Sequence, residues 1–389
     1  MLDIPLEDLQ NRGPFESRRP YSSISDPSGI HRKRQTMGNF ILILSYAIDW
    51  VLLIAFAVAG LLLGNLSPQK RPFNLENPDI SFPLHSDTVS VTNLLLLSVA
   101  LPIVVIFGVV ILFVPGGTVP RDTPRSLVWS RKIWEVHAGW LGLILSVVTT
   151  WFIVSTTKNL LGKPRPNALA RCQPDLDNLA RYIVGGISNT TTVAMGQLVS
   201  ADICTNPDKS VIDEGFRSFP SGHSSVAASG LIYLMLFLAS KLGVAAPWAP
   251  QGVHLGPTHH SAFPSRIDGE SLAGEGQAGR LPEQVMPFRR QAAAPPIYLV
   301  VLTLVPFALC IFICASRWYD FQHHGFDILF AFAIGATSSY VAFRFYHLPI
   351  SGGAGWAWAP RSEHSAFWAG VGKQGYRHSS TKLRQDSVC

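Results

Sequence analysis

A histidine and an aspartate in the last quarter of the chain, His323 and Asp327, have the types and spacing of a reactive pair. Residues four apart share one face of a helix. The carboxylate can then accept one ring N–H of the histidine, which leaves the other ring nitrogen free to attack. Ser316 and Arg317 lie just upstream and add a hydroxyl and a guanidinium, which suit a phosphate group. The run predicts phosphoryl chemistry at the border of an apolar segment.

Two cations earlier in the chain, Lys158 and Arg165, lie at the end of another apolar segment, and Pro166 follows the arginine. A phosphate monoester carries nearly two negative charges. These two side chains and Arg317 can neutralise it, and arginine adds planar two-point contacts. Alone, Lys158 is more typical of a lysine that reaches from a membrane segment to the interface. The phosphate interpretation therefore depends on the cations and histidines occurring together.

A third run, Pro220-Ser221-Gly222-His223, precedes an apolar segment. Ser221 supplies a hydroxyl, and Gly222 lets a backbone N–H approach an anion closely. The amides and dipole of a helix that starts here favour the same anion. His223 is the candidate general acid, a role typically worth 10²–10⁴-fold in rate. No carboxylate pair or His/Cys cluster occurs in the adjoining loops, so the sequence predicts a site without a metal, in which cations stabilise the transition state.

The composition indicates which elements position these runs. The chain has 389 residues, of which 48% are hydrophobic and only 14% are charged. Soluble domains carry roughly 25% charged residues, so a membrane protein is predicted. The net charge of +6 would suit nucleic acid. However, the basic residues lie in tails and loops rather than in an aromatic-rich patch, so no nucleic-acid partner is predicted.

Six segments are long enough to cross a bilayer, which takes ~20 apolar residues, and they predict an all-α membrane bundle. They are Phe40–Leu63, Thr92–Val114, Ala138–Thr156, Ser224–Ser240, Ile297–Ala315 and Phe326–Tyr346. The predicted membrane domain is 39–346. A disordered tail, 1–38, precedes it, a flexible insertion, 242–295, interrupts it, and a second tail, 347–389, follows it.

The Lys/Arg residues concentrate in the two tails and in the second and fourth loops, which are therefore expected to be cytosolic. The three reactive runs then face the lumen of an endomembrane (vacuole, Golgi or ER) or the cell exterior. Cys172 and Cys204 lie on that side, where an oxidising environment would let them pair; two free thiols are the alternative. Asn189 begins an Asn-Thr-Thr triplet on the same side and is a glycosylation candidate.

The three runs together resemble the three-part motif of the type 2 phosphatidic acid phosphatase superfamily, also called lipid phosphate phosphatases. Every defining position is filled, and the resemblance covers the six spans. It implies a helical bundle, metal-independent hydrolysis and a phosphohistidine on His323, with His223 as the acid and Asp327 in support. The residues that it implies bind phosphate are Lys158, Arg165, Ser221, Gly222 and Arg317.

The tails and the long fourth loop resemble those of fungal diacylglycerol pyrophosphate/phosphatidate phosphatases. The expected partner is a phospholipid substrate in the membrane, and the oligomeric state is left open. His324 is extra to the motif and is interpreted as a neighbour of the nucleophile. Phosphatases of sphingoid phosphates or polyprenyl diphosphates, and lipid phosphotransferases, share the three runs. A non-catalytic lipid-binding protein is an alternative of another class, and a transporter is hinted at only by Asp49 inside a span.

Overall fold

The computed structural model describes residues 28–114, 125–186, 196–242, 244 and 296–347. The chain divides into two units, Met1–Ile41 and Leu42–Cys389. Most of the predicted insertion, nearly all of the C-terminal tail and the glycosylation candidate Asn189 lie outside the described residues. The three reactive runs all lie in the second unit.

Six helices are long and apolar enough to cross a membrane, so the predicted all-α bundle is confirmed. The second and fourth spans each contain a short π-helical segment, η2 and η5. The spans are α1 (Ser28–Gly64); α2 (Val91–Leu95), η2 (Leu96–Ala100) and α3 (Leu101–Phe113); α4 (Arg125–Leu161); α7 (Gly222–Ala227), η5 (Ala228–Ile232) and α8 (Tyr233–Leu242); α10 (Ile297–Tyr319); and α11 (Gly325–Tyr346).

Helix ends are where the structure departs most from the expected spans. Helix α1 begins at Ser28, so residues 28–38 are helical rather than disordered. Extending an existing helix needs no new nucleus, and no proline interrupts the chain after Pro27 in this stretch. Helix α4 extends beyond the predicted span at both ends, because polar residues continue a helix that an apolar criterion truncates. Lys158 consequently lies in the last turn of α4.

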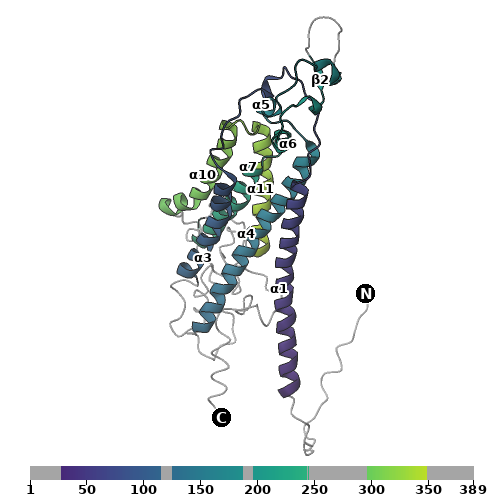
Figure 1. Cartoon of the computed structure of the whole chain (residues 1–389). Coiled ribbons are helices and arrows are strands. Elements are labelled where there is room, and N and C mark those ends of the chain that lie inside the picture. Colours follow the sequence, from purple (N-terminus) through teal and green to yellow (C-terminus); the bar gives the residue numbers. More distant parts are fainter. Residues whose placement is uncertain (1–27, 115–124, 187–195, 243, 245–295, 348–389) are drawn as a thin grey trace, which may run out of the picture. The chain divides into compact units, whose positions relative to one another are not determined.

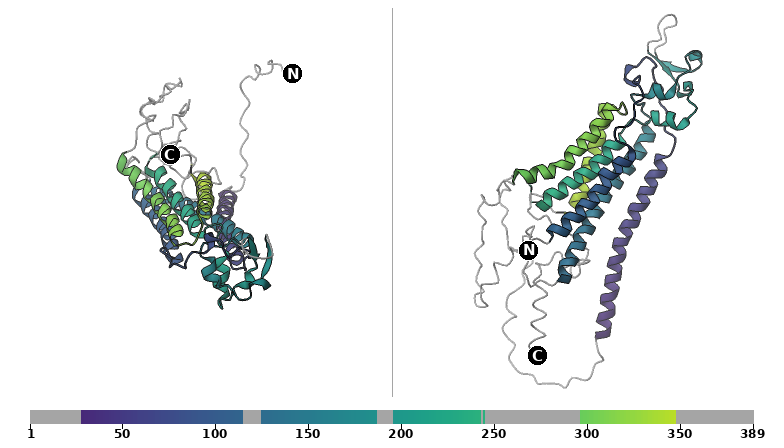
Figure 2. Two further views of the ribbon diagram at one scale, coloured as in Figure 1. Left: turned by 90° about the horizontal axis from the view of Figure 1, so that it is seen from above. Right: turned by 60° about the vertical axis from the view of Figure 1, so that its left-hand side comes forward.

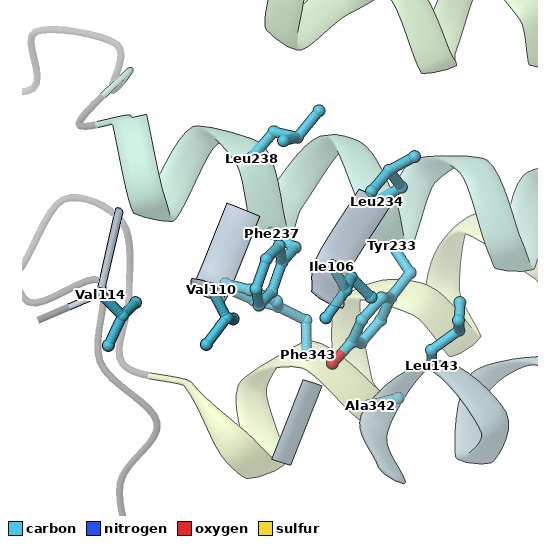
Figure 3. Close-up of a cluster of buried hydrophobic side chains, with 10 residues drawn as sticks. All are labelled: Ile106, Val110, Val114, Leu143, Tyr233, Leu234, Phe237, Leu238, Ala342 and Phe343. Atoms are coloured by element: carbon cyan, nitrogen blue, oxygen red, sulfur yellow. The ribbon is translucent and has the colours of Figure 1, made fainter. Parts of the chain in front are cut away.

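The fourth span is the centre of the bundle. In its most apolar window 78% of the residues are buried, and α3, α4, α10 and α11 all contact it; Figure 1 and Figure 2 show these helices side by side. One cluster of its core draws residues from α3, α4, α8 and α11 (Figure 3). Tyr233 and Phe237 of α8 are fully buried there beside Ile106. The helix that begins at the Ser221–His223 run is thus the most enclosed one.

Small residues let the backbones around η5 approach closely. A Cβ atom on Gly335 of α11 would lie 2.4 Å from the carbonyl oxygen of Ser225. One on Gly230 would lie 1.7 Å from the carbonyl oxygen of Ser98 in η2. The hydroxyl of Ser339 donates to the carbonyl oxygens of Ala228 and Ser229 at 3.0 and 2.9 Å. Such contacts satisfy carbonyls that a π-helical segment leaves free inside a membrane bundle.

Residues 65–90, 162–186 and 196–221 form a cap at one end of the bundle, with its own buried apolar cluster around Phe73, Ile203 and Phe216. Strands β1 (Ile183–Gly186) and β2 (Gln197–Val199) pair antiparallel there, with Ile183 opposite Val199. The short helices of the cap are η1 (Pro78–Ile80), α5 (Ala168–Cys172), η3 (Leu179–Arg181), η4 (Ala201–Ile203) and α6 (Lys209–Gly215). In Figure 1, α5, α6 and β2 lie together at that end. The cap covers the helix ends that carry the three reactive runs.

Candidate active site

His323 is held in the protonation state that a nucleophile needs. Its Nδ1 lies 2.7 Å from the backbone carbonyl oxygen of Ser218. A carbonyl only accepts, so Nδ1 carries the proton and Nε2 keeps its lone pair. The pKa of His323 lies well below the usual histidine value, because the ring is buried and because the charges of Arg165 and Lys158 lie nearby. The ring is therefore neutral near pH 7, and Nε2 is free to attack.

Asp327 makes no hydrogen bond to His323 in the described structure, and the two do not share a helix face as predicted. Helix α11 begins at Gly325, so His323 lies before the helix while Asp327 occupies its first turn. The carboxylate accepts the backbone N–H of His324 at 3.3 Å, a capping interaction that satisfies a free donor at the helix start. It also accepts the hydroxyl of Ser218 at 2.5 Å. Ser218 thus contacts both residues, with its hydroxyl on Asp327 and its carbonyl on His323.

Lys163 completes this arrangement. Its Nζ lies 2.7 Å from Oδ1 of the fully buried Asp327 carboxylate, which keeps that charge paired. The local chain path explains how Lys163 reaches it. Helix α4 ends at Leu161, and Gly162 has a φ of +56° that turns the chain. A Cβ atom on Gly162 would lie 1.4 Å from the carbonyl oxygen of Gln69, so only glycine fits this turn.

The structure brings Lys158 and the Ser221–His223 run together. The Nζ of Lys158 lies 3.5 Å from where a Cβ atom on Gly222 would be. Among the described residues the Lys158 side chain makes no hydrogen bond or ion pair, so its three donors are open to an anion. Ser221 caps α7, with its Oγ accepting the N–H of Ser224 at 3.4 Å. The first amides of α7 therefore meet the lysine at one point, as an anion site requires.

Arg165 is buried and directed by two partners that the sequence did not reveal. Its Nη1 donates to Oε1 of Gln322 at 2.5 Å, and its Nη2 donates to Oε1 of Glu214 at 2.6 Å. Its Nε is buried without a partner among the described residues. Because a fixed, charged guanidinium retains an open N–H here, Arg165 can bind an anion without rearranging.

Arg317 and His223 meet at the carbonyl oxygen of Val89. Nη2 of Arg317 and Nε2 of His223 each lie 3.1 Å from that oxygen. Arg317 also pairs with Asp320 at 2.8 Å and with Asp87 at 3.0 Å. Most of its N–H donors thus bind other groups of the protein. Arg317 therefore adds positive charge to the site and holds the loop of Asp87 and Val89 against His223. Ser316 accepts from Nε of Arg317 at 3.1 Å.

The residues that orient the site were missed because they lie in irregular loops without a periodic pattern. Buried cations need anionic or polar partners, and this rule points to acids in the same loops. Asp87, Glu214 and Asp320 have that role here.

Cys172 and Cys204 are joined by a disulfide that fixes α5 in the cap. In the part of the chain that the structure describes, no three His, Cys, Asp or Glu side chains gather as a metal-binding group.

Comparison with known proteins finds one family model and several relatives. Residues 139–350 match the model of the PAP2 superfamily. The chain is 27% identical to "Probable diacylglycerol pyrophosphate phosphatase 1" of Schizosaccharomyces pombe over 305 residues, which cover 78% of the chain and 81% of that protein. It is 30% identical to "Lipid phosphate phosphatase 2" of Arabidopsis thaliana over 197 residues, 50% of the chain and 57% of that protein.

A further relative is "Diacylglycerol pyrophosphate phosphatase 1" of Saccharomyces cerevisiae, 33% identical over 144 residues. This match covers 36% of the chain and 45% of that protein. No solved structure matches the chain. The matched family region includes Lys158, Arg165, the Ser221–His223 run and His323. It therefore contains both histidines and the two cations whose charges act on His323.

Proposed function

The chain belongs to the PAP2 superfamily, and we propose from this that it is an integral membrane lipid phosphatase. Its substrates are phosphatidate, diacylglycerol pyrophosphate or lysophosphatidate. One observation supports the proposal: runs that are far apart in sequence converge on His323, whose Nδ1 is held by the Ser218 carbonyl and whose ring lies close enough to Arg165 and Lys158 for their charges to lower its pKa. Such an arrangement suits a phosphate group better than any other ligand, because it joins a neutral nucleophile to fixed cations.

The reaction proceeds in two balanced steps. Nε2 of His323 attacks phosphorus, so an N–P bond forms while the P–O bond to the leaving group breaks. The leaving oxygen takes the electron pair and receives a proton from the imidazolium form of His223, whose Nε2–H donates to Val89 in the structure, and the ring is left neutral. Water then attacks the phosphohistidine and gives a proton to His223, which releases phosphate and restores both histidines.

In this proposal, cationic side chains and backbone amides stabilise the transition state. Lys158, Arg165 and the first amides of α7 bind the phosphoryl oxygens, on which charge develops in the transition state. Arg317 adds positive charge beside His223. We propose that no metal takes part. The support is that Arg165 and Lys158 lie near His323 and can neutralise the charge of a bound phosphate.

We propose that the active site faces the lumen or the cell exterior and that both termini are cytosolic. The disulfide between Cys172 and Cys204 lies in the cap that covers the site, and disulfides persist in oxidising compartments. The Lys/Arg distribution favours the same orientation. The polar headgroup of the substrate would then bind beneath the cap, while its acyl chains stay between the membrane spans.

The experiment that tests the function is phosphate release from phosphatidate in detergent micelles containing EDTA. The wild-type protein is expected to be active, and His323→Ala and His223→Ala are expected to lose nearly all activity. Trapping with labelled phosphatidate should give an acid-labile phosphohistidine in the wild type and in His324→Ala, but none in His323→Ala. Full activity of His323→Ala would refute the nucleophile, and loss of wild-type activity in EDTA would refute the metal-free mechanism.

A further inference from the structure

A second arginine, Arg171, lies beside the proposed phosphate-binding Arg165. Both donate to the same atom, Oε1 of Gln322, from Nη1 of Arg165 at 2.5 Å and from Nη2 of Arg171 at 3.2 Å. Gln322 is buried and directly precedes His323. Two guanidinium groups therefore converge on one neutral amide oxygen next to the nucleophile.

Acidic groups act on Arg171 only from a distance, since Glu214 and Asp87 raise its pKa without forming an ion pair with it in the described structure. Arg165 pairs with Glu214, but Arg171 makes no ion pair among the described residues. Its Nε donates to the neutral Oδ1 of Asn167 at 3.0 Å. Burial, and then the charge of Arg165, lowers the pKa of Arg171 from its usual value. An anion that bridges the two guanidinium groups would offset their mutual repulsion more than these carboxylates do.

Open hydrogen-bond donors surround this pair of arginines. Nη1 of Arg171 has no partner among the described residues. Asn167 is completely buried, and its Nδ2 also lacks a partner there. Nε of Arg165 is a third such donor. A buried donor without a partner costs free energy, so the two buried donors of Asn167 and Arg165, beside Nη1 of Arg171, indicate a place where an acceptor-rich group binds.

The segment that carries Arg171 is held rigidly. The next residue, Cys172, is bonded to Cys204. The carbonyl oxygen of Arg171 accepts Nδ2 of Asn206 at 2.8 Å, and that of Cys172 accepts the N–H of Thr205 at 3.1 Å. A ligand that binds Arg171 therefore does not have to order the backbone that presents it.

We propose that Arg171 and Asn167 form a second anion subsite, which binds a second phosphate linked to the one that His323 attacks. This inference rests on the proposed function and assigns the site to lipids with a diphosphate headgroup. The bond from Nε2 of His323 to the terminal phosphorus forms, and the bridging P–O bond breaks. The bridging oxygen leaves with the lipid monophosphate and takes the proton of His223. Arg171 stabilises the charge that develops on this leaving phosphate.

The test compares two substrates in the same micelles, diacylglycerol pyrophosphate and phosphatidate. Arg171→Gln is expected to lower kcat/KM for the diphosphate by about tenfold or more, as loss of a hydrogen bond to a charged group does. Its kcat/KM for phosphatidate should stay within about twofold. Asn167→Asp should cause the same selective loss, because the new carboxylate pairs with Arg171. The matched control is Arg181→Gln, which removes an exposed arginine of the cap.

Equal losses on both lipids, or no loss on either, would overturn the subsite. A binding measurement covers the case in which Arg171→Gln folds poorly or the wild type cleaves neither lipid. Inorganic pyrophosphate should raise the Tm of the wild type more than orthophosphate does, and Asn167→Asp should remove that difference. Equal Tm shifts from the two anions in the wild type would refute the subsite. A wild type that cleaves neither lipid refutes the proposed function instead.

Discussion

Asp327→Asn distinguishes a carboxylate that contacts the nucleophile from one that acts through a neighbour. The substitution keeps the shape of the side chain and removes its charge. In the structure the carboxylate contacts the Ser218 hydroxyl at 2.5 Å, while His323 is held by the Ser218 carbonyl at 2.7 Å. The variant therefore keeps the hydrogen bond to His323 and weakens only the support behind it.

The expected loss follows from these contacts. A hydrogen bond to a charged group contributes about 1.5–3 kcal/mol, which corresponds to roughly 10- to 150-fold in rate if all of it reaches the transition state. Removing an aspartate that directly holds a catalytic histidine costs about 10⁴-fold in a serine-hydrolase triad. We therefore expect kcat of Asp327→Asn to fall by roughly 10- to 150-fold, with little change in KM.

Stability should fall as well. Removing one partner from a buried ion pair costs about 3–5 kcal/mol. The Lys163 side chain is 37% exposed, so water can solvate it after the substitution, and the expected loss is reduced to about 1–3 kcal/mol. Thermal unfolding in micelles measures this loss separately from kcat. Asp202→Asn is the matched control, because Asp202 accepts a serine hydroxyl at 2.7 Å on the exposed surface of the cap.

The assay is a double-mutant cycle on phosphatidate hydrolysis with Asp327→Asn, Ser218→Ala and the double variant. If Asp327 acts through the Ser218 hydroxyl, the double variant should be little worse than either single variant. Ser218→Ala leaves the backbone carbonyl that holds His323. Additive effects, or an Asp327→Asn variant as inactive as His323→Ala while Ser218→Ala is fully active, would refute this reasoning.

Three further results are expected. Gly222→Ala should leave Tm unchanged, because its Cβ atom would meet only Nζ of Lys158 at 3.5 Å. Its kcat/KM should fall by roughly 10²-fold, because the new methyl group keeps phosphate away from the backbone N–H and from Lys158; unchanged kinetics would contradict the anion site. Because the folded-state pKa of His323 lies below the usual value, the unfolded chain binds more protons below pH ~6.5. The free energy of unfolding should therefore fall as the pH drops through that range, less steeply in His323→Asn, and an equal slope would contradict the assignment. Gly335→Ala should cost about 1–3 kcal/mol through overpacking, whereas Gly108→Ala, which has open space around it, should not; equal Tm values would refute the close helix approach.

The sequence predicted the site where residue spacing coincides with helix ends. Lys158 and His223 each lie within a few residues of the end of an apolar segment, so hydropathy alone places them at the same face of the bundle. The structure confirms the six spans that this argument needs. The residues proposed to react or to bind phosphate could be predicted from local pattern, because they lie at or near the ends of helices.

The residues that hold those reactive and phosphate-binding groups in place could not be predicted in this way. Arg165 is held by Gln322 and Glu214, and His323 is held by Ser218. The partners in these pairs are 49 to 157 residues apart in sequence, and no periodicity relates such pairs. The helix-face interpretation of His323 and Asp327 was wrong for a related reason. Spacing by four is equally compatible with a helix and with a loop that enters one, and the capping requirement of α11 selects the loop.

The fourth span links catalysis to global unfolding. Its first turn carries Ser221 and Gly222, and its remainder is the most enclosed helix of the bundle. This helix cannot shift at one end without disturbing its packing against four neighbouring helices. Heat should therefore not loosen the phosphate-binding turn before the bundle melts. Thermal inactivation and loss of helical circular dichroism should follow one curve, so a bundle-stabilising substitution should extend the working temperature of the enzyme by the same number of degrees.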